Sequence, residues 1–72
     1  MSMRIGVTRG LRGWFAVMYD TRTMEPEATG FGSYATAVEA AQEAAGWAAA
    51  EEIPVEAGID ALLTGIVPPG YA

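Results

Sequence analysis

The sequence predicts a small α+β domain in which an antiparallel β-sheet packs against one long helix, in the order β-β-β-α-β. Two observations carry this prediction. Residues 3–19 contain two runs of strand-forming residues joined by a short turn, and residues 37–51 consist almost wholly of strong helix formers. The 72 residues suffice for one domain, which we expect to span residues 1–72, with residues 66–72 as an extended tail.

The first two strands are expected to form a β-hairpin. Over residues 3–8, apolar side chains alternate with polar or small ones, which is the period of a strand with one buried face. Gly10 and Gly13 enclose the turn, because glycine readily adopts the positive φ angles that tight turns need. Residues 14–19 are rich in aromatic and branched side chains and make the second strand.

A third strand is expected over residues 28–34, after a looser connection that contains Pro26. Gly30 and Gly32 weaken this strand, since glycine has no side chain to pack in a sheet. The same glycines superficially resemble a phosphate-binding loop ahead of a helix. A dinucleotide-binding loop needs a third glycine and a P-loop needs a lysine, so we interpret the segment as structural.

The helix is expected over residues 37–51. Thr36 and Glu39 have the spacing of a capping box, in which each side chain satisfies a backbone N–H near the helix start. Pro54 requires the helix to end before it. At about 100° per residue, one outward arc holds Glu39, Gln42, Glu43, Gly46 and Ala50.

Alanine covers most of the remaining helix surface, so the helix can approach the sheet closely. The bulk of the core must then come from the sheet, where large side chains are available. The expected contributors are Trp14 or Phe15, Val17, Met18 and Phe31.

The C-terminal part is expected to contain a short strand or turn at residues 55–57 and one helical turn at residues 59–63, closed by Gly65. The proline-rich end of the chain should be extended. It would be tethered through Ile66, Val67 or Tyr71.

The chain contains no histidine and no cysteine. This removes the commonest general base, the thiol nucleophile and the usual ligands of zinc, copper and iron. Ser2 and Ser33 lack a histidine or lysine that could activate them. Paired carboxylates would need a deep cleft, which a domain of this size does not build. We therefore expect no enzymatic activity, no cofactor and no metal.

The charges are divided along the chain. All four arginines fall within the first 22 residues, whereas eight of the nine acidic residues follow, and the net charge is -5. The acidic part should repel nucleic acid. Residues 44–50, the longest apolar stretch, are too short to span a membrane, and the first 18 residues lack the pattern of a signal peptide. We expect a cytoplasmic protein.

Four glutamates are placed where the helix does not favour them. Glu39 and Glu43 stand four residues apart, where like charges repel, and Glu51 and Glu52 meet the negative end of the helix dipole. One interpretation is that they keep an alanine-rich helix in solution. The other is an outward acidic face for a basic partner, with Trp47 at its border as an apolar anchor. Trp47 could equally close one side of the core.

The hairpin turn carries a second candidate contact. Arg9 and Arg12 flank Leu11, and two arginines at a loop tip can grip a phosphate or an acidic partner. The acidic remainder of the chain argues against stable binding to nucleic acid.

Several segments resemble short uncharacterised proteins of phages and prophages in GC-rich bacteria. Some proteins of that size and setting are anti-CRISPR or other anti-defence inhibitors, several of them acidic α+β domains that occupy nucleic-acid-binding surfaces. The resemblance implies an inhibitor that acts in a bacterial host. The segments that carry it are Trp14-Phe15-Ala16-Val17, residues 29–36 (TGFGSYAT), Glu39-Ala40 and residues 47–51 (WAAAE).

These observations predict a non-catalytic protein-binding module, encoded by a mobile element, that engages a basic surface of a host protein. An alternative is a homodimeric structural or assembly protein that uses an exposed strand edge or the aromatic face of the sheet. A nucleic-acid accessory protein acting through the Arg9–Arg12 hairpin is a further alternative. The predicted partner-binding residues are Glu39, Glu43, Trp47, Glu51 and Glu52.

Overall fold

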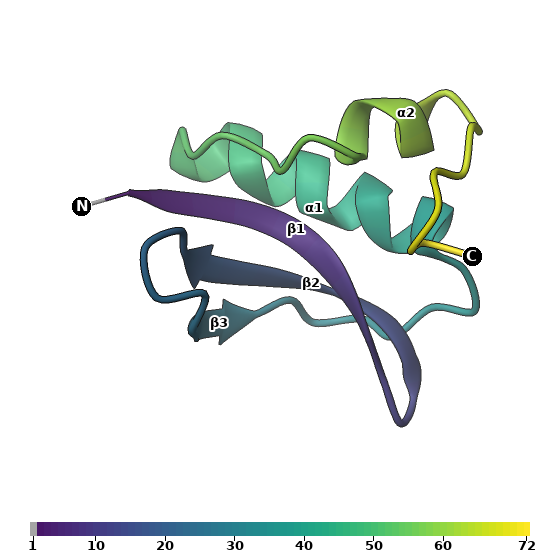
Figure 1. The fold of residues 1–72 in the computed structure, drawn as a ribbon, viewed down its shortest axis with the longest axis horizontal. Coiled ribbons are helices and arrows are strands. Elements are labelled where there is room, and N and C mark those ends of the chain that lie inside the picture. The colour runs from purple at the N-terminus through teal and green to yellow at the C-terminus, as the bar shows by residue number, and fades with distance from the viewer. Residues whose placement is uncertain (1) are drawn as a thin grey trace.

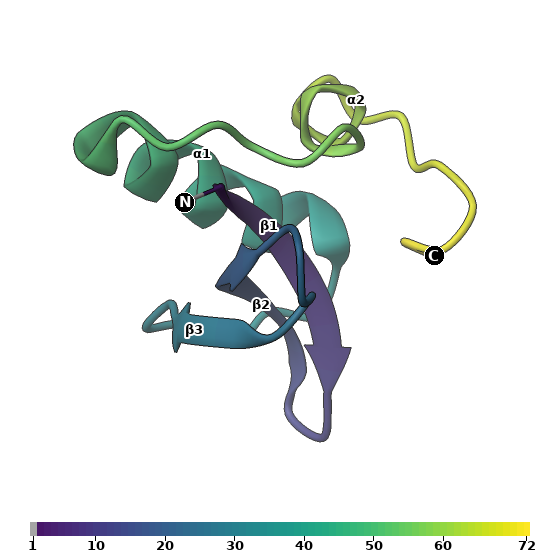
Figure 2. The same ribbon diagram turned by 60° about the vertical axis from the view of Figure 1, so that its left-hand side comes forward.

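The computed structural model describes residues 2–72, so the first residue of the expected domain lies outside the described residues. Three antiparallel strands form a sheet in the order β1-β2-β3, and a long helix packs across one face of it with a short helix alongside (Figures 1 and 2). The predicted α+β class is confirmed. The elements are β1 (Met3–Gly10), β2 (Gly13–Asp20), β3 (Pro26–Thr29), α1 (Ala37–Glu51) and α2 (Ile59–Leu63).

The first two strands form the predicted hairpin. They pair from Met3 opposite Asp20 to Gly10 opposite Gly13. Gly13 has a φ of 114°, a backbone conformation that side chains disfavour, and a Cβ atom there would collide with the carbonyl oxygen of Tyr34. The tip of this hairpin projects away from the rest of the molecule (Figure 1).

Strand alternation decides which side chains enter the core. Residues paired across the hairpin share a face, so Ile5 and Val7 lie on the same side as Trp14 and Ala16, beneath α1. Of the two alternatives predicted for the core, it is therefore Trp14, and not Phe15, that belongs to it. Val17 is buried too, but it alternates to the opposite face and does not belong to the core under α1, contrary to prediction.

The predicted helix begins and ends as expected. Thr36 is the N-cap, and its hydroxyl oxygen accepts the backbone N–H of Glu39 at 3.3 Å. The largest fully buried side chains of the molecule are Ile5, Ile59 and Leu62, so α2 supplies much of the bulk that alanine leaves to other elements. The buried face of α1 consists of Ala37, Ala40, Ala41, Ala44 and Ala48.

The third strand differs from the prediction of residues 28–34. β3 ends at Thr29, although the N–H of Gly30 still donates to the carbonyl oxygen of Ala16 in β2 at 2.8 Å. Contact with β2 then resumes at Tyr34, which forms a bridge with Trp14. Residues 31–33 bulge out of the sheet because the backbone N–H groups of Phe31 and Gly32 donate to a helix side chain instead of to a strand. Phe31, expected in the core, is fully exposed as a consequence.

The C-terminal part is held to the sheet at two places. The predicted strand at residues 55–57 is reduced to one parallel bridge, between Val55 and Ile5. The helical turn has its predicted bounds. Among the suggested tethers, Ile66 and Val67 are exposed, whereas the ring of Tyr71 packs 6.2 Å from that of Trp14.

Candidate functional site

A groove of about 470 Å³ lies between the chain that follows β3 and the outer side of α1. We call it the Phe31–Trp47 groove. It brings together two of the predicted partner-binding residues with a bulge that the sequence did not associate with them. The lining residues are Thr29, Gly30, Phe31, Gln42, Glu43, Gly46 and Trp47.

Glu43 fastens the bulge to the helix. Its Oε2 accepts the backbone N–H of Phe31 at 2.8 Å, and its Oε1 accepts the N–H of Gly32 at 3.0 Å and the hydroxyl of Tyr34 at 2.8 Å. Glu43 was expected to face solvent without an internal role. The structure corrects this, because the partners of its carboxylate come from a segment nine to twelve residues earlier in the chain.

These contacts keep Glu43 ionised. Burial raises the pKa of the carboxyl, but the hydrogen bonds from Tyr34, Phe31 and Gly32 together outweigh burial and hold the pKa below its ordinary range. A negative charge is therefore fixed in the wall of the groove at neutral pH.

Glu39 lies one helical turn before Glu43 and is exposed. Its carboxylate accepts the Thr36 hydroxyl at 3.1 Å, so this glutamate also has a local structural reason to be present. Its exposed charge stands on the same outward arc of the helix as Glu43.

Glu51 and Glu52 form a separate acidic surface. Glu51 is the last residue of α1, and Glu52 caps the helix with a left-handed φ of 57°; both are exposed. Eight residues of helix separate Glu43 from Glu51, which is roughly 12 Å along the axis. The five predicted partner-binding residues therefore occupy two surfaces, one at the groove and one at the far end of α1.

Trp47 takes the core position that one interpretation gave it, whereas its role as an anchor for a partner stays a prediction. It is partly buried against the core and also lines the groove. Phe31 lines the groove from the bulge, so two aromatic side chains contribute to its walls, one from each side.

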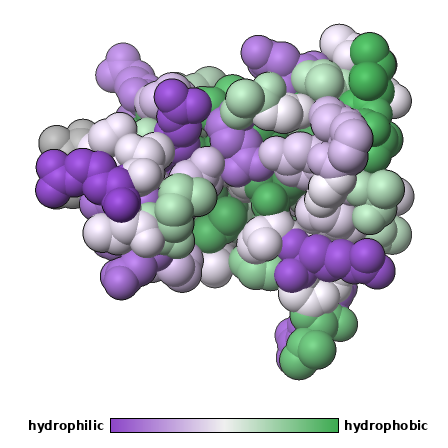
Figure 3. Space-filling model, viewed as in Figure 1, coloured by the Kyte–Doolittle hydropathy of each residue, from purple (hydrophilic) through white to green (hydrophobic). Residues whose placement is uncertain are grey.

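Arg9 and Arg12 lie outside the groove, exposed near the hairpin turn. Leu11 between them is fully exposed. In the space-filling view, apolar surface gathers at the projecting hairpin tip and over the C-terminal segment at the upper right, where Leu63, Ile66 and Val67 are exposed (Figure 3).

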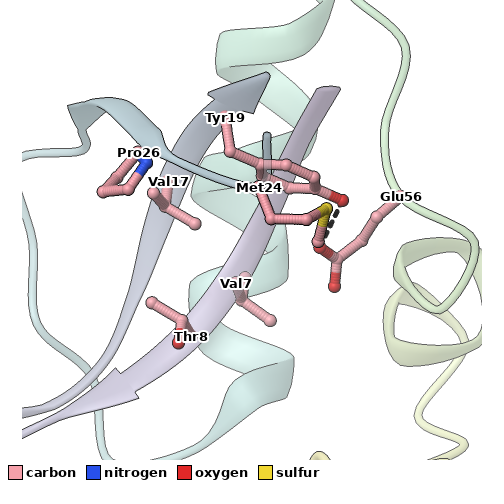
Figure 4. A pocket seen from close by; sticks show the side chains of 7 residues that line it. All are labelled: Val7, Thr8, Val17, Tyr19, Met24, Pro26 and Glu56. Carbon is pink, nitrogen blue, oxygen red and sulfur yellow. Dashed lines mark hydrogen bonds between the residues drawn. The ribbon is translucent and has the colours of Figure 1, made fainter. Parts of the chain in front are cut away.

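A smaller hollow of about 280 Å³ lies over the strands (Figure 4). Glu56 accepts the hydroxyl of Tyr19 at 3.1 Å and that of Tyr71, and Met24 extends across the hollow toward it. Burial and the contact with Glu56 raise the pKa of Tyr71 to about 12. These bonds join β2, the Val55 bridge and the chain end, so we assign the cluster a structural role. The lining residues are Val7, Thr8, Val17, Tyr19, Met24, Pro26 and Glu56.

Within residues 2–72, no group of three or more acidic side chains is arranged to hold a metal ion. No helix in the same range is both long and apolar enough to cross a membrane.

Comparison with known proteins gave no match: no protein-family model, no curated protein and no solved structure is significantly similar to this chain.

Sequence reasoning did not associate Phe31, Gln42 and Gly46 with a site. Two features of the sequence could have indicated Phe31 and Gly46, whereas none indicated Gln42. Phe31 stands between two glycines, a setting in which a large apolar residue has little strand neighbourhood to pack against. Gly46 interrupts a helix of strong helix formers, which is unfavourable unless something needs the space.

Proposed function

We propose that the protein is a non-catalytic protein-binding domain whose contact surface is the Phe31–Trp47 groove, with Glu39 nearby on the same helical arc. The proposal rests on the exposure of the Phe31 side chain and on the hydrogen bond of its backbone. Its side chain is fully exposed, yet its backbone N–H is bonded to Glu43 beside an open groove. Because this hydrogen bond already fixes the backbone at Phe31, association has less backbone freedom to remove, and exposed aromatic residues are common interface anchors.

The proposed partner presents a basic surface. Support comes from the net charge of -5, from the fixed charge of Glu43 and from the absence of any basic residue after Arg22. Opposite charge on the partner would steer its approach and favour the correct orientation.

The proposed biological role is that of an inhibitor or accessory factor of a phage or other mobile element, of the anti-defence, anti-CRISPR-like kind, in the cytoplasm of a bacterial host. The sequence resemblance supports this role. An acidic domain that covers a basic, nucleic-acid-binding surface would inhibit its host protein by competition.

The homodimer alternative would use an exposed strand edge. The edge strand β3 carries Pro26, which has no backbone N–H to donate, and the exposed charge of Glu27. Both features hinder pairing of strand edges between molecules. The nucleic-acid alternative rests on Arg9 and Arg12 alone, against the net negative charge.

The hairpin supplies a matched control for testing this proposal. Phe31 and Leu11 are equally exposed, but only Phe31 lines the groove. In a pull-down from a lysate of a GC-rich bacterium, wild type and Leu11→Ser should capture the same protein. Phe31→Ser should bind that protein at least about tenfold more weakly, as expected for loss of an anchor. Equal binding by all three proteins would refute the groove as the contact surface.

A further inference from the structure

We infer that the Phe31–Trp47 groove receives an arginine side chain of the partner protein. This inference rests on the proposed function and names the chemistry that the groove recognises. Three features support it: an acceptor site left over on Glu43, the aromatic residues of the walls, and the glycine at position 46.

The carboxylate of Glu43 has capacity for a further donor. An ionised carboxylate offers about four acceptor sites on its two oxygens. Within the described residues, Oε1 accepts two hydrogen bonds and Oε2 accepts one, from the N–H of Phe31. A guanidinium N–H can occupy the remaining site on Oε2 as a charge-assisted hydrogen bond.

The walls suit the rest of an arginine side chain. Phe31 and Trp47 both line the groove, and no basic residue is among its lining. An arginine can lay its apolar stem along such surface and stack its planar, weakly hydrated guanidinium on an aromatic ring. A purely apolar side chain would instead cover Glu43 without giving its carboxylate a donor, which is unfavourable.

Gly46 keeps the groove open. Glycine is less favourable than alanine in the interior of a helix. Apart from its chain neighbours and the backbone of its own helix, a Cβ atom at Gly46 would meet no atom of the described residues within 4 Å, so internal packing does not require glycine there. Gly46 also lines the groove, and its missing side chain leaves room for an incoming stem.

The test is a titration of the full chain, followed by NMR, with the blocked tripeptide acetyl-Ala-Arg-Ala-amide. We expect shifts of the Trp47 indole and Gly46 amide signals that saturate with a dissociation constant on the order of a millimolar, because one charge-assisted hydrogen bond to a partly exposed carboxylate and one stacking contact are formed. The neutral isostere with citrulline in place of arginine should bind at least about fivefold more weakly, since its urea group carries no charge. Equal binding of the two peptides, or no shift at Trp47, would overturn the inference.

Variants of α1 provide a second readout. Gly46→Leu places a side chain in open space and should fold normally while losing most binding of the arginine peptide. Ala49→Leu is the matched control, since Ala49 is exposed on the same helix but does not line the groove. Unchanged peptide binding by Gly46→Leu would refute the inference.

The two proposals can fail separately. Capture from the lysate could depend on Phe31 while the arginine peptide leaves the NMR signal of the Trp47 indole unchanged. The groove would then bind a protein without recognising an arginine side chain, and only the inference would fail. If capture does not depend on Phe31, the proposed function itself fails.

Discussion

At the scale of single residues, Glu43 illustrates how one side chain joins a structural role to a binding surface. It holds the bulge through three hydrogen bonds and leaves a fixed negative charge in the groove. Because both effects depend on ionisation, they should disappear together in acid.

We expect Glu43→Gln to lower the free energy of unfolding at neutral pH by about 1–2 kcal/mol, because Glu43 is partly exposed and its hydrogen bonds should contribute less than the usual value for a charged group. The folded-state pKa of Glu43 lies below its unfolded value. Its contribution is therefore complete above the unfolded pKa and is lost as pH falls through the lower folded value. Urea denaturation between about pH 7 and about pH 3 measures this. The wild type should lose more stability than the variant over that range, and identical losses would show that Glu43 does not hold the bulge.

At the scale of elements, the helix α1 and the chain end are placed by different kinds of contact. α1 lies against the sheet through alanines, whereas the chain after α2 is fastened by Tyr71 to Glu56 and against Trp14. Few contacts therefore hold the chain after α2 in place. One of them is the hydrogen bond that the Tyr71 hydroxyl donates to Glu56.

Tyr71→Phe should make the protein less sensitive to alkali. Burial, followed by the contact with Glu56, raises the pKa of Tyr71 to about 12 in the folded state. The contribution of the neutral hydroxyl is complete below the unfolded tyrosine pKa of about 10 and is lost as pH rises through the folded value. The wild type should therefore lose stability over this interval, and Tyr71→Phe should lose less.

Thermal melts across the alkaline interval, with a parallel titration of tyrosinate absorbance, provide the measurement. The pKa of Tyr19 is also raised, by burial and then by Glu56, so some alkaline loss will remain in the variant. An unchanged pH dependence would mean that Tyr71 does not fasten the chain end to Glu56.

At the scale of the whole molecule, the charges are divided between the elements of secondary structure. β1 and the hairpin turn carry Arg4, Arg9 and Arg12, whereas α1 and the segments after it carry only acidic charges. A basic partner should therefore be attracted toward the helix side and turned away from the hairpin.

Reversing single charges tests which acidic surface is used. Glu39→Lys and Glu51→Lys change the net charge equally, from -5 to -3, but only Glu39 lies near the groove. The association rate with the captured protein should fall severalfold for Glu39→Lys and less for Glu51→Lys. The difference should shrink when salt is raised to about 1 M, where the Debye length is about 3 Å. A larger effect of Glu51→Lys would move the contact surface to the far end of α1.

The sequence by itself determined the elements whose causes are local. The alternation in β1, the glycine-bounded turn and the Thr36 N-cap each depend on residues within a few positions of one another, and all are confirmed. The other half of the capping box differs, because the Glu39 carboxylate accepts the hydroxyl of Thr36 and not its backbone N–H. The pattern of alanines likewise predicted a helix packed closely on the sheet.

Only the tertiary structure decided the rest, because the deciding contacts join residues that are far apart in the chain. The bulge leaves the sheet since Glu43 competes for its N–H groups, and this turns Phe31 outward. Tyr19 meets Glu56 across 37 positions. Such pairings depend on how the elements pack, so they cannot be predicted from the periodicity of a short stretch of sequence. The groove exists for the same reason, since its two walls become neighbours only when α1 lies beside the chain after β3.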